Sequence, residues 1–305
     1  MPPYVSDVLE PLLAAADARS AVREHCACLL DSLEPHLQRR LGRAAHYVGG
    51  KCMGYPAIWL LQMVLEPRGA SLRAIVDRSE PALTVSLTTS IVDDLMDRDE
   101  PVDEECVGLL YLLMTSAAFR TSSSSDIAAA QRAFLGKALD VCAGSGEGPD
   151  ADTRRGDRIG HFFRMIAAGP ASAWLSGREA DALVEATGRF GAFCAHLDDW
   201  IDRERDEAAG VSSNVAVRLR RELLEAPSNG RRRHDDVRAL SSRMKDVLIA
   251  QLREIRPLLD SIHAREAIAA LDAAESRIEG CIADVEAARV RDDWMHAGLR
   301  HTLHT

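Results

Sequence analysis

Residues 81–97, "PALTVSLTTSIVDDLMD", form a segment that is apolar or small almost to its end. It then places three carboxylates, Asp93, Asp94 and Asp97, within five positions. Like charges this close repel one another, and burying each of them costs several kcal/mol unless a cation compensates it. The segment therefore raises the question of why a helix that otherwise builds an apolar core ends in three carboxylates.

The rest of the chain favours helix almost everywhere. Its 305 residues are 47% apolar and 28% charged, an ordinary globular balance, and aromatic residues make up only 5%. Ala, Leu, Arg and Glu dominate, and apolar residues recur at three- and four-residue spacing. The expected helices cover 18–42, 55–66, 70–79, 81–97, 105–119, 126–143, 158–177, 179–205, 214–225, 235–262 and 264–290.

The breaks between these segments are short and are typical of loops within one domain rather than linkers between domains. The most polar breaks are "TSSSSD" at 121–126, "AGSGEGPDADTRRGD" at 143–157 and "APSNGRRRHDD" at 226–236. The sequence therefore predicts an all-α fold without a convincing strand. We expect a single domain over residues 1–305, a helical barrel or bundle of about 11–13 helices.

Charge and composition exclude several classes of protein. The net charge is −10, and the one dense basic cluster, "NGRRRH" at 229–234, falls in an expected loop, which argues against a nucleic-acid partner. No uncharged apolar stretch reaches the roughly 20 residues that span a bilayer, and the N-terminus lacks the pattern of a signal peptide. The seven cysteines form no CxxC pair. We expect a soluble cytoplasmic protein with reduced thiols.

The acidic motif occurs twice. "HLDDWID", residues 196–202, repeats the D-D-x-x-D spacing with Asp198, Asp199 and Asp202. Positions i and i+4 share one face of a helix, so Asp93 pairs with Asp97 and Asp198 with Asp202. Two such pairs facing each other would make an all-oxygen site that suits Mg²⁺, which takes one or two carboxylates, water and substrate phosphates. One copy alone would fit a solvated helix end, whereas two copies after apolar helices favour a metal site.

The two motifs, in "SIVDDLMDRDE" and "FGAFCAHLDDWIDRERDE", resemble those of the trans-isoprenyl diphosphate synthases and their class I terpene synthase relatives. "YVGGKC", residues 47–52, is similar to the family's Gly-Gly-Lys-Arg stretch. The resemblance implies an isoprenoid-synthase helical barrel, roughly three Mg²⁺ ions between the carboxylates and a substrate diphosphate, and a homodimer. It also implies that an allylic diphosphate is ionised inside an apolar barrel that excludes water.

Departures from the family pattern distinguish chain elongation with isopentenyl diphosphate from conversion of a single prenyl diphosphate. The family holds isopentenyl diphosphate with an Arg after Gly-Gly-Lys, a His seven residues before the first motif and an Arg pair after it. Here the first two positions are Cys52 and Ser86, and "RDEPVDEECVG" follows the motif without an Arg pair. Each lost charge-assisted contact costs about 1.5–3 kcal/mol. The resemblance therefore favours a terpene synthase that converts one prenyl diphosphate, C15 to C25, to a hydrocarbon or alcohol.

The candidate site collects the two motifs and the residues around them. The candidate catalytic residues are Asp93, Asp97 and Asp198. The candidate metal ligands are Asp93, Asp94, Asp97, Asp198, Asp199, Asp202 and Asp206. The candidate substrate-binding residues are Lys51, Arg158, Arg164, Thr88, Thr89 and Asn214.

The reasons for the less obvious choices come from the same resemblance. Arg158 or Arg164 stands at about the distance where the family carries a basic residue for the leaving diphosphate. Thr89 and Thr88 are small where bulky residues would shorten the barrel. Asp206 and Asn214 follow the second motif and extend the site, although a helix cap and loop would explain them equally well.

Two alternatives remain open at this point. The first is a trans-prenyltransferase, such as a polyprenyl diphosphate synthase, that joins the allylic diphosphate to isopentenyl diphosphate or another nucleophile. The second is a non-catalytic subunit of a heteromeric synthase, although two complete acidic motifs have no purpose in such a subunit. Dependence of turnover on isopentenyl diphosphate distinguishes the first alternative, and Mg²⁺ and pyrophosphate binding by the isolated chain distinguishes the second.

Overall fold

The computed structural model describes residues 9, 12–31, 54–97, 151–209, 214–225 and 233–280. It describes the backbone alone for 29–31, 85–97, 151–158, 205, 209, 224–225 and 233–238. Within these ranges the chain is helical apart from short turns, with no strand, as the expected all-α class requires. The helices are α2 (Ala16–Asp31), α5 (Tyr55–Leu65), η1 (Glu66–Arg68), α6 (Leu72–Asp97), α9 (Ala151–Trp174), α10 (Gly177–Ala209), α11 (Val215–Glu225) and α12 (Arg233–Ser261). A further helical run covers 265–280.

Local sequence explains where α5 and η1 begin and end. Pro56 stands in the first turn of α5, where its missing N–H costs no hydrogen bond. Gly69 closes η1 with φ +87, a left-handed backbone that glycine adopts without steric cost. The Gly69 N–H donates to the Glu66 carbonyl, and the Ala70 N–H donates to the Leu65 carbonyl. This C-terminal capping pattern stops the helix and turns the chain into α6.

Two expected boundaries were wrong. The expected helices 70–79 and 81–97 are one helix, α6, which runs through Pro81. A proline inside a helix removes one hydrogen bond and bends the axis, and packing on neighbouring helices can outweigh that cost. The expected loop at 143–157 is helical from Ala151 onward, because α9 already begins there. The last residues of this polar segment contain no further proline, so nothing in it prevents helix formation.

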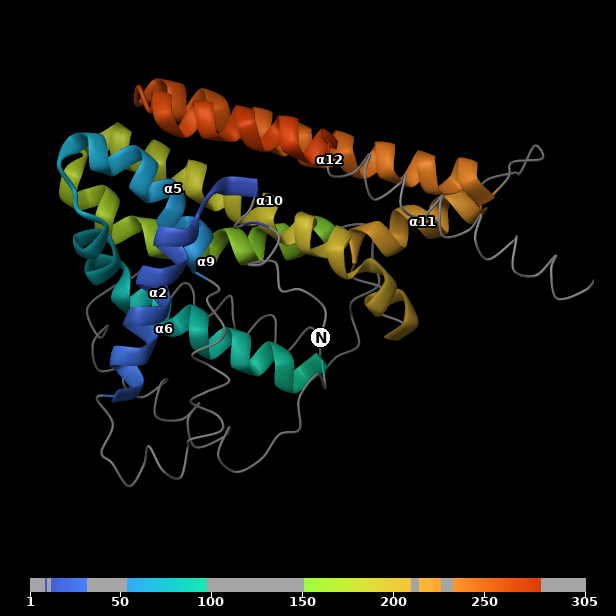
Figure 1. The fold of residues 1–305 in the computed structure, drawn as a ribbon, viewed down its shortest axis with the longest axis horizontal. Coiled ribbons are helices and arrows are strands. Elements are labelled where there is room, and N and C mark those ends of the chain that lie inside the picture. Colours follow the sequence, from blue (N-terminus) through green and yellow to red (C-terminus); the bar gives the residue numbers. More distant parts are fainter. Residues whose placement is uncertain are drawn as a thin grey trace, which may run out of the picture.

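Helix α9 lies between α6 and α10 and runs antiparallel to both (Figure 1). On the α6 side, the Ser79 hydroxyl donates to the Ile166 carbonyl over 2.9 Å. On the α10 side, a Cβ added to Gly191 would lie 2.7 Å from the Phe163 ring and 3.1 Å from the Ile159 carbonyl oxygen. The absent side chain at 191 therefore lets the two helices approach closely.

The core lies where α5, α9 and α10 meet. Phe190 packs against Trp59 and Phe193 with ring centroids 5.6 and 5.7 Å apart, and against Phe163 at 6.5 Å. All four side chains are buried. Aromatic pairs at these separations contribute beyond their buried area, so this cluster fixes α10 to α5 and α9. Helices α5, α6, α9 and α10 contact one another in a closed ring.

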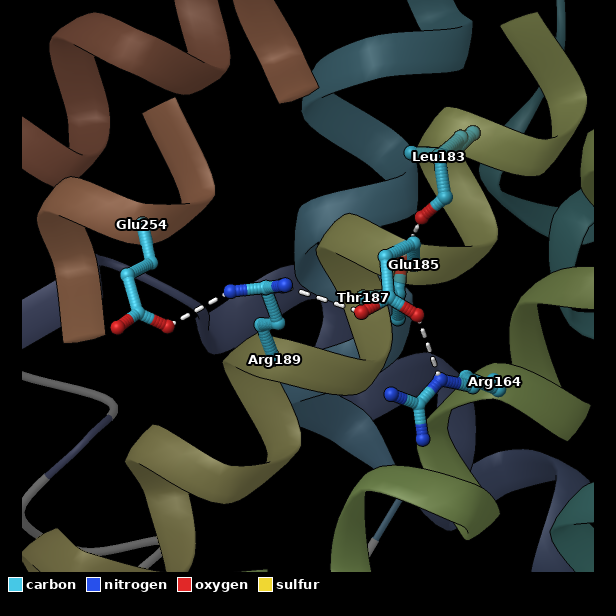
Figure 2. A network of polar contacts seen from close by, with 6 residues as sticks. All are labelled: Arg164, Leu183, Glu185, Thr187, Arg189 and Glu254. Carbon is cyan, nitrogen blue, oxygen red and sulfur yellow. Dashed lines mark hydrogen bonds and ion pairs between the residues drawn. The ribbon is translucent and has the colours of Figure 1, made fainter. Parts of the chain in front are cut away.

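A chain of ion pairs joins α9, α10 and α12 on the outer side of this ring (Figure 2). Glu185 accepts from Arg164 Nε over 3.0 Å and from Arg189 Nε over 3.1 Å, and Arg189 Nη1 reaches Glu254 over 2.7 Å. Partial burial acts to raise the pKa of Glu185, but Arg164 and Arg189 outweigh it and hold the pKa below its ordinary value. The network links the three helices at the surface.

None of the described helices is both long and apolar enough to cross a bilayer.

Candidate functional site

The two acidic motifs lie on parallel helices, because α6 and α10 are each antiparallel to α9. The hydrogen bond between Ser79 and Ile166 places these residues of α6 and α9 at the same level. The Arg164–Glu185 pair places residue 164 of α9 level with residue 185 of α10. Because α9 and α10 are antiparallel, Ile166 is then level with about residue 183 of α10. Asp93 lies 14 residues beyond Ser79, and Asp198 lies 15 residues beyond Leu183. At a rise of 1.5 Å per residue, the two motifs therefore stand within about one helical turn of the same level along the bundle. Figure 1 shows the C-terminal ends of α6 and α10 on the same side of the molecule.

Helix register also gives the faces on which the motifs stand. Positions 93 and 97 of α6 fall in line with Ser79, which contacts α9. On α10, Asp198 and Asp202 fall in line with Gly191, which also contacts α9. Both motifs therefore continue the α9-facing sides of their helices. The side chains of Asp93, Asp94 and Asp97 lie outside the described residues, and only the positions of these residues along the backbone of α6 are described.

Asp198 and Asp202 are partly buried and one helical turn apart. One turn earlier on the same side of α10 lies the buried thiol of Cys194. Burial raises the pKa of this thiol well above its ordinary value, and the negative charge of Asp198 raises the pKa further. The carboxylate of Asp198 is therefore close enough to the Cys194 thiol to affect its ionisation.

Asp199, the middle residue of the motif, occupies a different environment at the junction of α10 with α11. It is fully buried, and its Oδ2 accepts the N–H of Val215, the first residue of α11, over 3.0 Å. Its backbone carbonyl accepts a hydrogen bond of 2.8 Å from the Asn214 side chain. Asp199 therefore joins the two helices, a role that the sequence analysis did not anticipate.

Asn214 is the N-cap of α11. Its Oδ1 accepts the Val217 N–H over 3.0 Å, as an N-cap asparagine does. Its Nδ2 also donates to Asp206 Oδ2 over 2.8 Å, and both side chains are buried. The helix cap that the sequence offered as an alternative thus describes what Asn214 does here. An Asn directly before the apolar-periodic run "VAVRLRR" was the available signal.

The remaining substrate-binding candidates are either far from the second motif or lie outside the described residues. Arg164 is bonded to Glu185 and lies against Gly188, where an added Cβ would stand 2.6 Å from the Arg164 side chain. Glu185 precedes Asp198 by 13 residues, or about 20 Å of helix, so this position does not favour a contact with a diphosphate at the motif. Outside the described residues lie Lys51 and the side chains of Thr88, Thr89 and Arg158.

The described residues include carboxylates that could supply part of a Mg²⁺ site. No group of three or more His, Cys, Asp or Glu side chains gathers for a metal ion within the described residues. Asp198 and Asp202 instead offer two carboxylates on one side of α10. Mg²⁺ binds proteins through one or two carboxylates and keeps water or phosphate oxygens for the remaining positions. The pair is thus suitable for Mg²⁺. The first motif, at about the same level on α6, is the other possible source of ligands.

Comparisons with known proteins gave no relative for this chain. No family model, no curated protein and no solved structure matches it significantly. The case for a function therefore rests on the repeated motif and on the geometry of α6, α9 and α10.

Proposed function

We propose that this chain is a Mg²⁺-dependent class I terpene synthase that ionises one prenyl diphosphate, C15 to C25, and converts it to a terpene hydrocarbon or alcohol. The observation that carries the proposal is the common level of the two acidic motifs on parallel helices. Their α9-facing positions follow from contacts of Ser79 and Gly191 that do not involve the motifs themselves. Chance would rarely align two copies of one motif in both level and face.

In this proposal Asp93, Asp97, Asp198 and Asp202 hold the metal ions at the end of the bundle. Mg²⁺ bound there would supply Lewis-acid stabilisation of the charge on the leaving diphosphate. The repulsion among the carboxylates makes the empty site unfavourable and therefore favours its filling by cations. The acidic residues thus bind and orient the diphosphate, while the hydrocarbon chain extends along the helices.

The apolar interior supplies the remaining requirement, which is exclusion of water. Phe190 lies eight residues before Asp198, about 12 Å along α10, and belongs to the buried aromatic cluster with Trp59, Phe163 and Phe193. A prenyl chain anchored at the motifs would point toward this cluster. Aromatic faces also attract a positive charge, which an ionised allylic group carries.

The proposal favours one substrate over two because the sequence lacks three family contacts for isopentenyl diphosphate. Cys52 and Ser86 replace an Arg and a His, and the Arg pair after the first motif is missing. A prenyltransferase would need to hold that second diphosphate with other cations.

The test is a product assay on the full chain. The protein is incubated with Mg²⁺ and each of the C10, C15, C20 and C25 prenyl diphosphates, with and without isopentenyl diphosphate, and the extracts are analysed by mass spectrometry. We expect a hydrocarbon or alcohol, with release of pyrophosphate, in the absence of isopentenyl diphosphate. The control is Asp198→Ala, which should make no product while retaining its melting temperature.

Two other outcomes would overturn the proposal in different ways. A longer diphosphate formed only with isopentenyl diphosphate would show a prenyltransferase. No turnover of any substrate, together with no binding of pyrophosphate in Mg²⁺, would favour the non-catalytic subunit.

A further inference from the structure

The C-terminal part of α10, which carries the second motif, is supported differently from the rest of the helix. With the register given by the Arg164–Glu185 pair, the first described residue of α9, Ala151, is level with about residue 198 of α10. Beyond that level, the described chain supports α10 through α11 and α12. The orientation of Asp198 and Asp202 therefore depends on what fixes α10 to α11 and α12, and the contacts with α11 are the ones that adjoin the motif.

Among the described residues, Asp199, Asp206 and Asn214 make buried polar contacts between α10 and α11. Asp199 and Asn214 are fully buried, and Asp206 is 8% exposed. Asn214 donates to both the Asp199 carbonyl and the Asp206 carboxylate, and the Asp199 carboxylate accepts from the first N–H of α11. A buried polar group that loses its partner keeps the full cost of its desolvation, so these bonds hold firmly.

Adjacent residues on a helix point about 100° apart. When the Asp199 side chain is fixed on the start of α11, the rotation of this part of α10 about its own axis is fixed as well. Asp198 and Asp202 are then held away from α11, on the side in line with Gly191.

We propose that Asp199, Asp206 and Asn214 form a positioning clamp that holds Asp198 and Asp202 in the orientation required for Mg²⁺ binding. The inference rests on the proposed function, and it assigns the three residues to positioning rather than to metal or substrate contact. Asp199, the middle aspartate of the motif, orients α10 through its hydrogen bonds and does not bind the metal ion.

The test compares four variants of the full chain. Asp199→Asn keeps an oxygen that accepts the Val215 N–H but removes the charge, Asn214→Ala breaks the clamp, and Asp198→Asn weakens a proposed ligand. The matched control is Glu207→Gln, because Glu207 pairs with Arg220 and also joins α10 to α11, but at the surface. Binding of inorganic pyrophosphate in Mg²⁺ is measured by calorimetry, and amide hydrogen exchange is followed in peptides from 198–209.

The expected pattern separates positioning from ligation. Asn214→Ala should speed exchange in 198–209 and weaken pyrophosphate binding about 10-fold or more, as loss of a ligand-orienting contact does. Asp199→Asn should stay within about threefold of the wild type in both measurements, because its hydrogen bonds survive. Asp198→Asn should weaken binding without changing exchange, and Glu207→Gln should change neither.

Two results would overturn the clamp. If Asp199→Asn weakens pyrophosphate binding as much as Asp198→Asn, Asp199 is a ligand. If Asn214→Ala leaves the exchange of 198–209 unchanged, the three residues do not hold this part of α10. Failure of the proposed function is recognised separately: the wild-type chain then binds no pyrophosphate in Mg²⁺, while the exchange data still decide whether the clamp exists.

Discussion

At the scale of single residues, neighbours within one motif have different roles because a helix turns them to different sides. Asp199 is fully buried at the start of α11, whereas Asp198 and Asp202 are only partly buried. The sequence predicted that carboxylates would gather in this segment. It could not distinguish their roles, because the distinction depends on where α11 begins and how it packs on α10.

The same geometry predicts how the thiols react. Cys194 is buried beside Asp198, and both burial and this charge raise the pKa of its thiol, whereas Cys28 of α2 is exposed. Only the thiolate is nucleophilic. With iodoacetamide at a mildly alkaline pH, we therefore expect peptides containing Cys28 to be alkylated while Cys194 remains unmodified, as read by mass spectrometry.

The control for this labelling is the same reaction in denaturant, where both cysteines should react at similar rates. Alkylation of Cys194 in the native protein at the rate of Cys28 would contradict the burial of this face of α10.

At the scale of helices, the arrangement depends on how closely α9 approaches α6 and α10. Glycines stand at these crossings: a Cβ on Gly191 would meet Phe163 and Ile159, and a Cβ on Gly169 would lie 2.4 Å from the Arg78 carbonyl oxygen. The periodicity of the sequence predicted that these segments are helical. It did not predict which helices pair, because a glycine within a helical segment can equally mark a weak helix or a close crossing.

The crossing of α9 and α10 gives a stability prediction. Gly191→Ala should destabilise the protein by about 1–3 kcal/mol, the usual cost of adding a methyl group to a filled contact. The measurement is the free energy of unfolding in urea. The matched variant is Gly280→Ala, at a helical position where no described atom lies within 4 Å of the added Cβ.

Gly280→Ala should be neutral or should stabilise the protein by up to about 1 kcal/mol, because alanine is the better helix former. Equal effects of the two substitutions would show that Gly191 is not a close crossing.

At the scale of the whole molecule, the sequence predicted the all-α class and most helix positions, since α5 and α11 begin and end within one residue of the expected segments. It missed the continuity of α6 through Pro81 because a proline signals a helix end unless tertiary packing outweighs it. From the sequence, the expectation that the two motifs face each other rested on the family resemblance alone. Their common level comes from contacts between distant segments, such as Ser79 with Ile166, which no local pattern encodes.

The central claim is that the motifs on α6 and α10 form one site, and a double-mutant cycle tests it most directly. Calorimetry would measure the affinity for inorganic pyrophosphate in Mg²⁺ for the wild type, Asp93→Ala, Asp198→Ala and the double variant, with melting temperatures as the control for folding. Residues that act on one bound group give non-additive effects. We predict that each single substitution weakens binding at least about 10-fold and that the double variant binds no more weakly than the weaker single variant. Additive losses, or an Asp93→Ala variant with wild-type affinity, would contradict the claim.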